Sequence, residues 1–362
     1  MRVLFATLPA VGHLYPMVPL AWALRAAGHD VLVAVPDDFT AEVTAAGLPA
    51  ASTSATLRSQ STVDQLRTGV VGREVGAEGG LVDVTEATVD ATVALVRNWR
   101  PDVVVIEPTA RAGQLAAAHA GVPVVLLPWG MLIPPEFSAG GAGVRWNEPG
   151  PLERRLGLTE VPPPVLALEV CPPGYQYPNP FPVRHMRYVP YNGRMVRPDW
   201  LDEDRRRACV TVSSPSEPMA AVVRELAAAG LDVHIGVADR HREQVLALVG
   251  DVAGVRSVGM LPLGVVLPSC AVAAHDGSAG KALTALAHGV PQLVLPLEAD
   301  QFLHADRVQE VGVGLRADAD PAAAVRAVLD SQEIAKQARV LAEEIAAQPS
   351  PADIAARFGE LV

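Results

Sequence analysis

The sequence predicts an α/β fold made of two doubly wound domains, each a parallel sheet covered by helices. The chain has 362 residues, more than the roughly 100–200 that one domain usually holds. Short apolar strand patterns alternate with helix patterns in two separate regions, and continuous apolar strands are typical of parallel sheets buried on both faces. Hydrophobic residues form 50% of the chain and aromatic residues only 4%, so the cores must consist mainly of Ala, Val and Leu.

The first alternation occupies about the first 130 residues. Gly28 stands where a helix-terminating glycine belongs, between a helix and a strand. The expected strands are Val3–Ala6, Val31–Val35, Val103–Ile106 and Val122–Leu127, and the expected helices are Met17–Ala27 and Arg111–Ala120.

The second alternation begins at about Ala208, after a stretch over 129–200 whose prolines and glycines are typical of loops and linkers. Its expected strands are Ala208–Val212, Val233–Val237, Val255–Val258, Val272–His275 and Gln292–Leu295. Its expected helices are Met219–Ala229, Arg242–Val249, Ala279–His288, Gln301–Val311 and Ala338–Ala347, with a last short helix after Pro351. We therefore expect one domain over 1–200, joined by a C-terminal helix within 349–362, and a second over 201–348.

Composition excludes several classes of function. With 29 basic and 40 acidic residues the net charge is −11, which argues against nucleic-acid binding and against an anionic membrane surface. The 3 cysteines lie far apart and form no Cys-x-x-Cys pair, which argues against a disulfide framework or a structural zinc site. We find neither a signal-peptide pattern nor an apolar run of membrane-spanning length, so we expect a soluble cytoplasmic protein without stable membrane insertion.

Ligands of doubly wound sheets bind at the carboxyl ends of the strands, so the loops after strands are the first candidate sites. His13 follows the first strand at the start of a helix, whose positive end favours a neutral imidazole that can act as a general base. Glu107 follows the strand Val103–Ile106 and is placed to orient His13. The competing interpretations are a capping or core histidine and a solvated loop glutamate.

The strongest local motif is His275-Asp276-Gly277-Ser278-Ala279-Gly280-Lys281, between a strand and a helix. Its small residues let backbone N–H groups approach an anion at a helix N-terminus, and His275 and Lys281 are possible additional donors. It matches neither a Walker A loop nor a Gly-x-Ser-x-Gly elbow, and a tight turn without a ligand is the competing interpretation. Asp300 and Gln301 follow another strand and suit sugar hydroxyls, unless Asp300 only caps a helix.

The order of these motifs resembles the GT-B glycosyltransferases, specifically family 1 enzymes of actinobacterial natural-product (antibiotic) pathways. The most specific stretch is His275 to Gly314, which is close to the family pattern HHGGAGT-x-x-x-A-x-x-x-GVPQ-x-x-x-P-x-x-x-DQ-x-x-NA-x-R-V-x-x-x-G-x-G. Gly12-His13-Leu14-Tyr15-Pro16 matches the family's G-H-x-x-P loop, and Gly28-His29-Asp30-Val31 matches the start of its second strand. The resemblance implies two Rossmann-like domains facing a central cleft, the N-terminal one for the acceptor and the C-terminal one for the donor.

The resemblance also implies an activity: inverting transfer of a deoxysugar from a TDP-sugar to a hydrophobic polyketide or aromatic aglycone. His13 would be the general base and Glu107 would orient it. The implied donor-binding positions are Gly12, Ser213, Ser214, Met260, Leu261, His275, Gly277, Ser278, Ala279, Gly280, Lys281, Asp300 and Gln301. Candidate walls of the acceptor pocket are Trp129, Met131, Phe137 and Trp146, although these side chains could simply hold a loop in place. The resemblance implies no metal ion and no cofactor beyond the TDP-sugar co-substrate; a homodimer is open.

The sequence departs from the family pattern at several positions. Asp276 replaces a histidine, Lys281 a threonine, His304 an asparagine, and Glu107 the usual aspartate. A carboxylate at 276 would repel a diphosphate unless it points away, and Lys281 could offset its charge.

These departures leave two alternatives to a transferase. One is a non-catalytic GT-B helper of a partner transferase. The other is a nucleotide-sugar epimerase, which would need several carboxylates around the sugar, where only Glu298 and Asp300 are visible.

Overall fold

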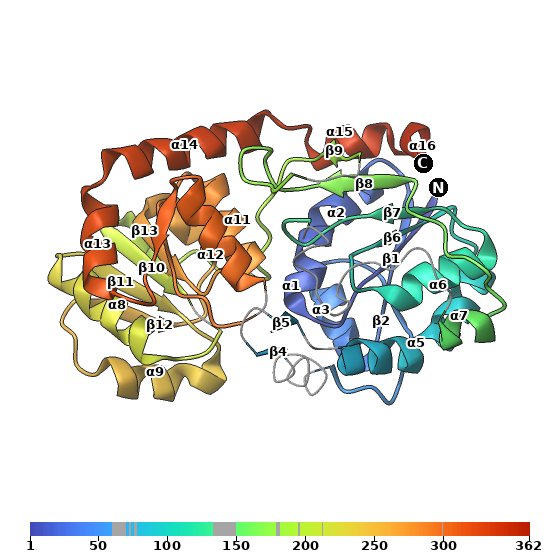
Figure 1. Ribbon diagram of the computed structural model, residues 1–362, viewed down its shortest axis with the longest axis horizontal. Helices are drawn as coiled ribbons and strands as arrows, with labels where there is room; N and C mark the ends of the chain where they lie inside the picture. Colours follow the sequence, from blue (N-terminus) through green and yellow to red (C-terminus); the bar gives the residue numbers. More distant parts are fainter. Residues whose placement is uncertain are drawn as a thin grey trace. The chain divides into compact units, whose positions relative to one another are not determined.

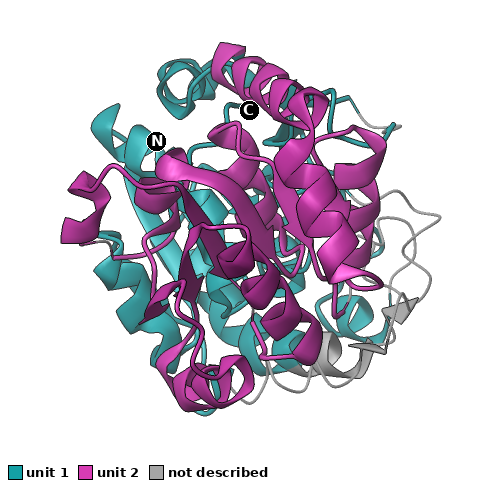
Figure 2. Ribbon diagram, turned by 90° about the vertical axis from the view of Figure 1, so that its left-hand side faces the viewer, with its two compact units in different colours: residues 1–191, 348–362 teal, residues 192–347 magenta. Residues whose placement is uncertain are grey.

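The structure is a computed structural model that describes residues 1–59, 70–71, 74–75, 78–132, 150–178, 182–194, 196–211, 213–298 and 300–362. The chain divides into two compact units (Figure 2). Unit 1 contains residues 1–191 and 348–362, and unit 2 contains residues 192–347. The C-terminal segment therefore returns to the unit in which the chain began.

Unit 1 is built on a parallel sheet in the order β3-β2-β1-β6-β7-β8-β9. These strands are β3 (Ala50–Ser52), β2 (Asp30–Val35), β1 (Arg2–Ala6), β6 (Val103–Ile106), β7 (Val124–Leu126), β8 (Leu166–Glu169) and β9 (Arg184–His185). Val3 in β1 pairs with Val31 on one side and with Val103 on the other, so the carboxyl ends of these three strands lie at one edge. The direction of strand addition reverses at β1, which makes its carboxyl end a binding crevice.

Because parallel crossovers are right-handed, the helices that connect strands on the two sides of β1 cover opposite faces of the sheet. In Figure 1, α5 lies beside α6, and the C-terminal α15 packs against α2. The helices of unit 1 are α1 (Val11–Leu14), α2 (Val18–Ala26), α3 (Thr40–Ala45), α5 (Glu78–Trp99), α6 (Arg111–Ala120), α7 (Pro151–Arg155), α15 (Pro351–Ala356) and α16 (Phe358–Leu361). A short antiparallel pair, β4 (Val70–Val71) and β5 (Glu74–Val75), precedes α5.

Unit 2 repeats the plan with the order β12-β11-β10-β13-β14-β15, again reversing at its first strand, β10. Its strands are β10 (Arg207–Thr211), β11 (Asp232–Gly236), β12 (Val255–Gly259), β13 (Cys270–His275), β14 (Gln292–Val294) and β15 (Gly314–Arg316). Its helices are α8 (Glu217–Ala228), α9 (Arg242–Val249), α10 (Leu263–Val266), α11 (Ala279–Ala287), α12 (Gln301–Glu310), α13 (Pro321–Asp330) and α14 (Gln332–Ala347). Its main core cluster is almost entirely Ala, Val and Leu, as the composition predicts.

The two parallel-sheet α/β folds confirm the predicted fold class. The sequence patterns missed α5, although it is 22 residues long, because threonines occupy part of its buried face, for example Thr88 and Thr92. They also missed β8 and β9, which lie in the proline-rich stretch predicted to be loop and linker. In the part of the chain that the structure describes, no helix combines the length and apolar character needed to cross a bilayer.

Candidate functional site

In unit 1 the candidate residues lie where the strand order reverses. His13 follows β1 and Glu107 follows β6, and these two strands are neighbours in the sheet. Helical backbone continues without a break from α1 through the 3₁₀ turn Tyr15–Met17 into α2. His13 therefore stands in the first turn of a longer helical stretch that begins at Val11. Gly12, the residue before it, has open space where a Cβ would be.

The side chains of His13 and Glu107 meet at this edge. His13 Nδ1 lies 3.3 Å from Glu107 Oε2, and the Glu107 side chain is fully buried. The carboxylate accepts the N–H of Leu8 at 2.9 Å and the N–H of Thr109 at 2.7 Å. Burial acts to raise the pKa of Glu107, but the charge of His13 and these hydrogen bonds outweigh it and hold the pKa below its ordinary value. The carboxylate is therefore ionised at neutral pH.

An ionised carboxylate on Nδ1 determines what the imidazole can do. It favours the tautomer with its proton on Nδ1, which leaves Nε2 as the proton acceptor. The His13 side chain is 20% exposed, so the ring is not sealed in the core. This geometry is that of a base and its orienting acid, with glutamate in place of the aspartate usual in the family pattern.

Thr109 belongs to the same cluster and was missed by the sequence analysis. Its hydroxyl lies 2.8 Å from both carboxylate oxygens of Glu107 and 3.3 Å from His13 Nδ1. Its place two residues after Glu107 is visible in the sequence, but the direction in which its hydroxyl points is not. Thr109 thus holds Glu107 through both its hydroxyl and its backbone N–H.

One predicted acceptor-pocket residue, Trp129, lies against the candidate base. Its ring centroid is 4.3 Å from that of His13, with the planes tilted by 37°. It follows β7, the strand next to β6, and Met131 two residues later is buried. Phe137 and Trp146 lie outside the described residues.

In unit 2 a buried ion pair ties together the loops after β10 and β13, the strands at its reversal. Asp276 is fully buried, and its Oδ2 accepts the N–H of Ser213 at 2.8 Å and lies 2.7 Å from Lys281 Nζ. Its Oδ1 accepts the N–H of Ser278 at 3.1 Å. Burial raises the pKa of Asp276, but Lys281 and these hydrogen bonds hold it far below its ordinary value. The carboxylate is thus enclosed and paired with Lys281, in the first turn of the helix that follows the loop.

The His275 side chain, which we expected to donate to a diphosphate, contacts protein groups instead. The ring is 1% exposed, Nδ1 accepts the N–H of Gly277 at 3.0 Å, and Nε2 lies 2.8 Å from Gln292 Oε1. Burial lowers the pKa of His275 to about 4, so the ring is neutral. A buried imidazole needs partners for both nitrogens, and here both partners are protein groups. His275 shapes the loop in this structure.

The backbone of the same loop also differs in part from the expectation. The N–H groups of Gly277 and Ser278, predicted to face a ligand, donate to the side chains of His275 and Asp276. Gly277 has φ +84°, and a Cβ there would lie 2.7 Å from the backbone oxygen of Gln301, so only glycine fits. Ala279, Gly280 and Lys281 form the first turn of α11.

The remaining predicted donor residues also lie at the carboxyl ends of unit 2 strands. Asp300 occupies the N-cap position of α12, and its side chain makes no capping hydrogen bond to that helix. Gln301 Oε1 accepts the N–H groups of Leu297 at 2.8 Å and Glu298 at 3.2 Å, which shapes the loop after β14. Ser213 and Ser214 follow β10, and Met260, 71% exposed, and Leu261 follow β12.

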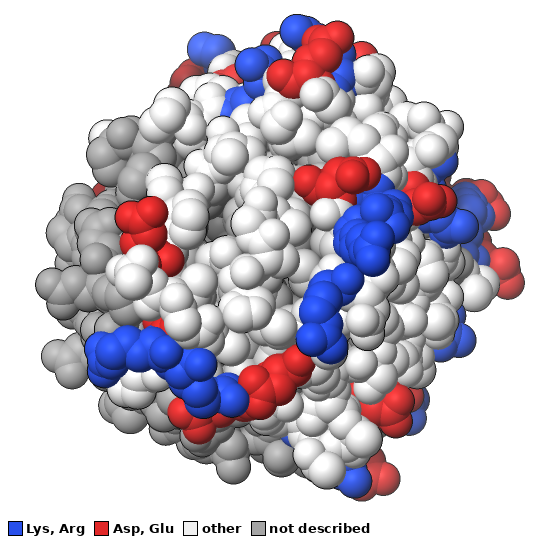
Figure 3. Space-filling model, turned by 90° about the vertical axis from the view of Figure 1, so that its right-hand side faces the viewer, with Lys and Arg blue, Asp and Glu red and all other residues white. Residues whose placement is uncertain are grey.

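The distribution of charge and of metal-ligating side chains bears on what else the protein could bind. Figure 3 shows one face of the molecule, on which acidic and basic side chains form small mixed groups with uncharged surface between the groups. Within the described ranges, no group of three or more His, Cys, Asp or Glu residues is placed to hold a metal ion.

Comparison with known proteins identifies the family. Residues 22–213 match the N-terminal domain, and residues 220–361 the C-terminal domain, of the family described as erythromycin biosynthesis protein CIII-like. The chain is 36% identical to L-demethylnoviosyl transferase of Streptomyces niveus, covering 98% of this chain and 97% of the relative. It is 30% identical to 3-alpha-mycarosylerythronolide B desosaminyl transferase of Saccharopolyspora erythraea, covering 100% of this chain and 98% of the relative.

Solved structures agree with these relatives over the whole chain. The Streptomyces sp. SF2575 glycosyltransferase SsfS6, complexed with thymidine diphosphate, has a TM-score of 0.81 at 33% identity and covers 100% of both chains. The spinosyn rhamnosyltransferase SpnG, complexed with spinosyn aglycone, has a TM-score of 0.82 at 30% identity, covering 99% of this chain and 100% of the other. Family model, relatives and fold lead to one conclusion: the chain belongs to the erythromycin biosynthesis protein CIII-like family of GT-B glycosyltransferases.

Proposed function

We propose that the chain is an inverting glycosyltransferase that moves a deoxysugar from a TDP-sugar to a hydroxyl of a hydrophobic natural-product acceptor, a polyketide or an aromatic aglycone. Unit 1 binds the acceptor, unit 2 binds the donor, and no metal ion takes part. The observation that carries this proposal is the contact between His13 Nδ1 and the buried, ionised carboxylate of Glu107.

The proposed reaction uses the imidazole nitrogen of His13 that does not face Glu107. Nε2 of His13 takes the proton of the acceptor hydroxyl while the acceptor oxygen attacks the anomeric carbon of the sugar. The bond from that carbon to the diphosphate breaks, and TDP leaves with the electron pair. Glu107 stabilises the imidazolium that forms. A single displacement of this kind inverts the anomeric configuration.

The loop and helix that follow β13 support the donor side of the proposal. The N-terminus of α11 is the positive end of a helix dipole, which favours the negative charge of a diphosphate. Lys281 in its first turn is 18% exposed, and it offsets the negative charge of Asp276, which would otherwise repel a diphosphate. Relatives support TDP as the nucleotide, because structures of SsfS6 and SpnG hold thymidine diphosphate. The local helix dipole, with Asp276 neutralised by Lys281, supports anion binding in a chain whose net charge is −11.

A transfer assay tests the proposal. The purified protein is incubated with a panel of TDP-deoxysugars and with aromatic and macrolide acceptors, and products are detected by mass. The expected result is one sugar added to at least one acceptor, with the opposite anomeric configuration to the donor in the product's NMR spectrum. A product with retained configuration would overturn the inverting mechanism.

The same preparation separates a transferase from a non-catalytic helper. Thermal stabilisation by millimolar TDP, combined with transfer, supports the enzyme. Stabilisation without transfer to any acceptor in the panel would favour the helper. The ordered His13–Glu107 contact favours the enzyme, since a helper has no use for an oriented base.

A further inference from the structure

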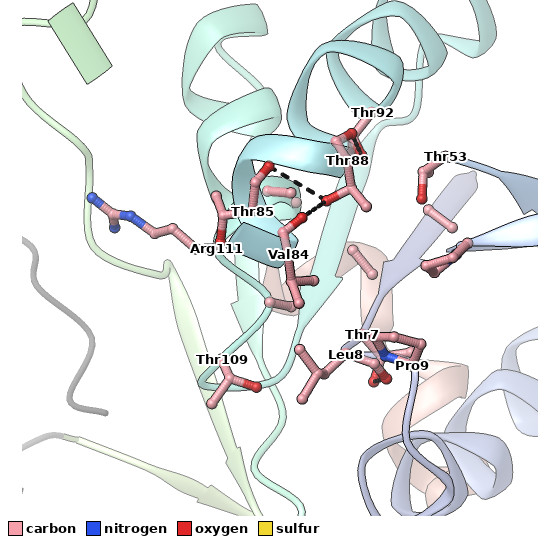
Figure 4. A pocket seen from close by; sticks show the side chains of 16 residues that line it. Thr7, Leu8, Pro9, Thr53, Val84, Thr85, Thr88, Thr92, Thr109 and Arg111 are labelled. Carbon is pink, nitrogen blue, oxygen red and sulfur yellow. Dashed lines mark hydrogen bonds between the residues drawn. The ribbon is translucent and has the colours of Figure 1, made fainter. Parts of the chain in front are cut away.

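A pocket in unit 1 is lined by threonine side chains from four segments of the chain (Figure 4). The threonines come from α5 and from residues that follow β1, β3 and β6, and Ala34 and Pro36, at the end of β2, also line the pocket. The threonines are Thr7, Thr53, Thr85, Thr88, Thr92 and Thr109. Thr109 connects this pocket to the candidate base, because its hydroxyl contacts both Glu107 and His13.

Most of these threonines already use their hydroxyl proton in a hydrogen bond within the protein. Thr88 donates to the backbone oxygen of Val84 at 2.7 Å, and Thr92 donates to that of Thr88 at 2.7 Å. Thr7 donates to the oxygen of Leu8 at 3.1 Å. Thr109 donates to the Glu107 carboxylate at 2.8 Å. A hydroxyl has one proton, so these groups retain only acceptor lone pairs for a ligand.

The rest of the lining is largely apolar. Small aliphatic residues and prolines, such as Ala6, Pro9, Ala34 and Pro36, separate the threonines. Among the lining residues that the structure describes, Arg111 is the charged one, and its guanidinium pairs with Glu153. In Figure 4 its side chain extends away from the threonines. The pocket thus combines aliphatic side chains with threonine oxygens that can accept hydrogen bonds.

We propose that this pocket binds a hydroxyl-bearing edge of the acceptor ring system and selects acceptors that carry O–H donors there over their O-methylated counterparts. An apolar ring fits the aliphatic lining, and ring hydroxyls donate to the oxygens of Thr88 and the other threonines of α5. A methoxy group has no proton to donate to these oxygens, so a buried threonine oxygen would lose the hydrogen bond that a hydroxyl-bearing ligand gives it. This proposal rests on the proposed function, and it names the chemical class of the acceptor.

The test measures binding without any sugar donor, using 1,2-dihydroxyanthraquinone and 1,2-dimethoxyanthraquinone as probes. Thr88→Val keeps the shape of the side chain and removes its oxygen. We expect this variant to bind the dihydroxy probe about 10-fold more weakly, which is one lost hydrogen bond, and to bind the dimethoxy probe as the wild type does. Thr88→Ser, which keeps the hydroxyl, should restore the preference.

Thr44→Val is the matched control. Thr44 is an exposed helix threonine outside the pocket, and its hydroxyl bonds to the backbone oxygen of Ala41 in the same manner. This variant should bind both probes as the wild type does. If Thr88→Val weakens both probes equally, or neither, the proposal is overturned.

A parallel transfer assay with the wild type separates the two proposals. Selective binding without transfer to any acceptor would overturn the proposed function while leaving the pocket assigned. Transfer to acceptors without a preference for hydroxylated ones would overturn the pocket proposal alone.

Discussion

His13 contacts an ionised carboxylate through Nδ1, so the other ring nitrogen can take a proton. We expect His13→Ala to reduce kcat by at least about 100-fold with an acceptor whose hydroxyl does not ionise by itself, the usual scale for a general base. The measurement is steady-state turnover, with the dissociation constant of TDP as the control, which should not change. Turnover close to that of the wild type would contradict the assignment.

Thr109 and Glu107 act on the reaction only through His13, so they are positioning residues. Glu107→Gln should lower kcat, because a neutral amide does not stabilise the imidazolium.

Thr109→Val should lower kcat by about 10-fold through loss of one charge-assisted hydrogen bond. The acceptor KM should change little in both variants, and Thr109→Ser should restore kcat. A change in KM alone would indicate a role in acceptor binding.

Some residues of the candidate site were predicted from the sequence, and others beside them were not. His13 and Glu107 were predicted because each directly follows a strand, and strand order brings those two positions together. Thr109 was not, because nothing in a sequence states which way a loop hydroxyl turns. His275 was predicted to touch ligand, but its burial and its contact with Gln292 depend on packing between strands β13 and β14.

At the scale of elements, the loop between β13 and α11 depends on the pair Asp276 and Lys281. Both residues depart from the family pattern, and they contact each other, so we expect their substitutions to be coupled. Lys281→Ala leaves a buried carboxylate without its cation and should reduce the free energy of unfolding by about 3–5 kcal/mol. It should also weaken TDP binding, through the loss of positive charge and of loop order.

The double variant Asp276→His with Lys281→Thr restores the family residues at both positions. We expect it to be more stable than Lys281→Ala, because no buried charge remains unpaired. Denaturation in urea and titration with TDP, applied to Asp276→His, to Lys281→Thr and to the double variant, measure the coupling. Additive effects of the two single substitutions would contradict it.

Elements were predicted well where one physical signal dominated. The bounds of β6 and α6 agree with the sequence analysis, because their apolar pattern and the glycine after α6 are unambiguous. The long helix α5 was missed because Thr85, Thr88 and Thr92 lie on its buried face at the threonine-lined pocket. These threonines interrupt the apolar period on which the prediction depends.

For the whole molecule, buried titratable groups give the two units opposite responses to pH. In unit 2, burial lowers the pKa of His275 and of His234 to about 4. Between about pH 6.5 and 4 the unfolded chain binds protons there that the folded unit does not, so unit 2 loses stability as the pH falls. In unit 1, burial raises the pKa of Glu169 to about 8. The folded unit keeps that proton up to about pH 8, so unit 1 loses stability as the pH rises from about 4.5 to 8.

Urea denaturation followed by tryptophan fluorescence between pH 5 and 8 tests this response. Trp200 lies in unit 2 and stacks on His234 with ring centroids 3.6 Å apart, whereas the other tryptophans of the chain lie in residues 1–191. The variant Trp200→Phe therefore reports unit 1 alone, and its transition should move to lower urea as the pH rises. Glu169→Gln in that background should remove most of this slope. A transition of unit 1 that stays at the same urea concentration, or moves to higher urea, as the pH rises would contradict the prediction.

The division of the chain has a consequence for how the protein is made. Unit 2 is continuous, while unit 1 includes residues 348–362, whose α15 packs against α2 near the beginning of the chain. During translation the segment that completes unit 1 is synthesised only after all of unit 2. The surface of α2 that packs against α15 therefore stays uncovered while the whole of unit 2 is being made, and unit 1 cannot complete its fold until the synthesis of unit 2 has ended.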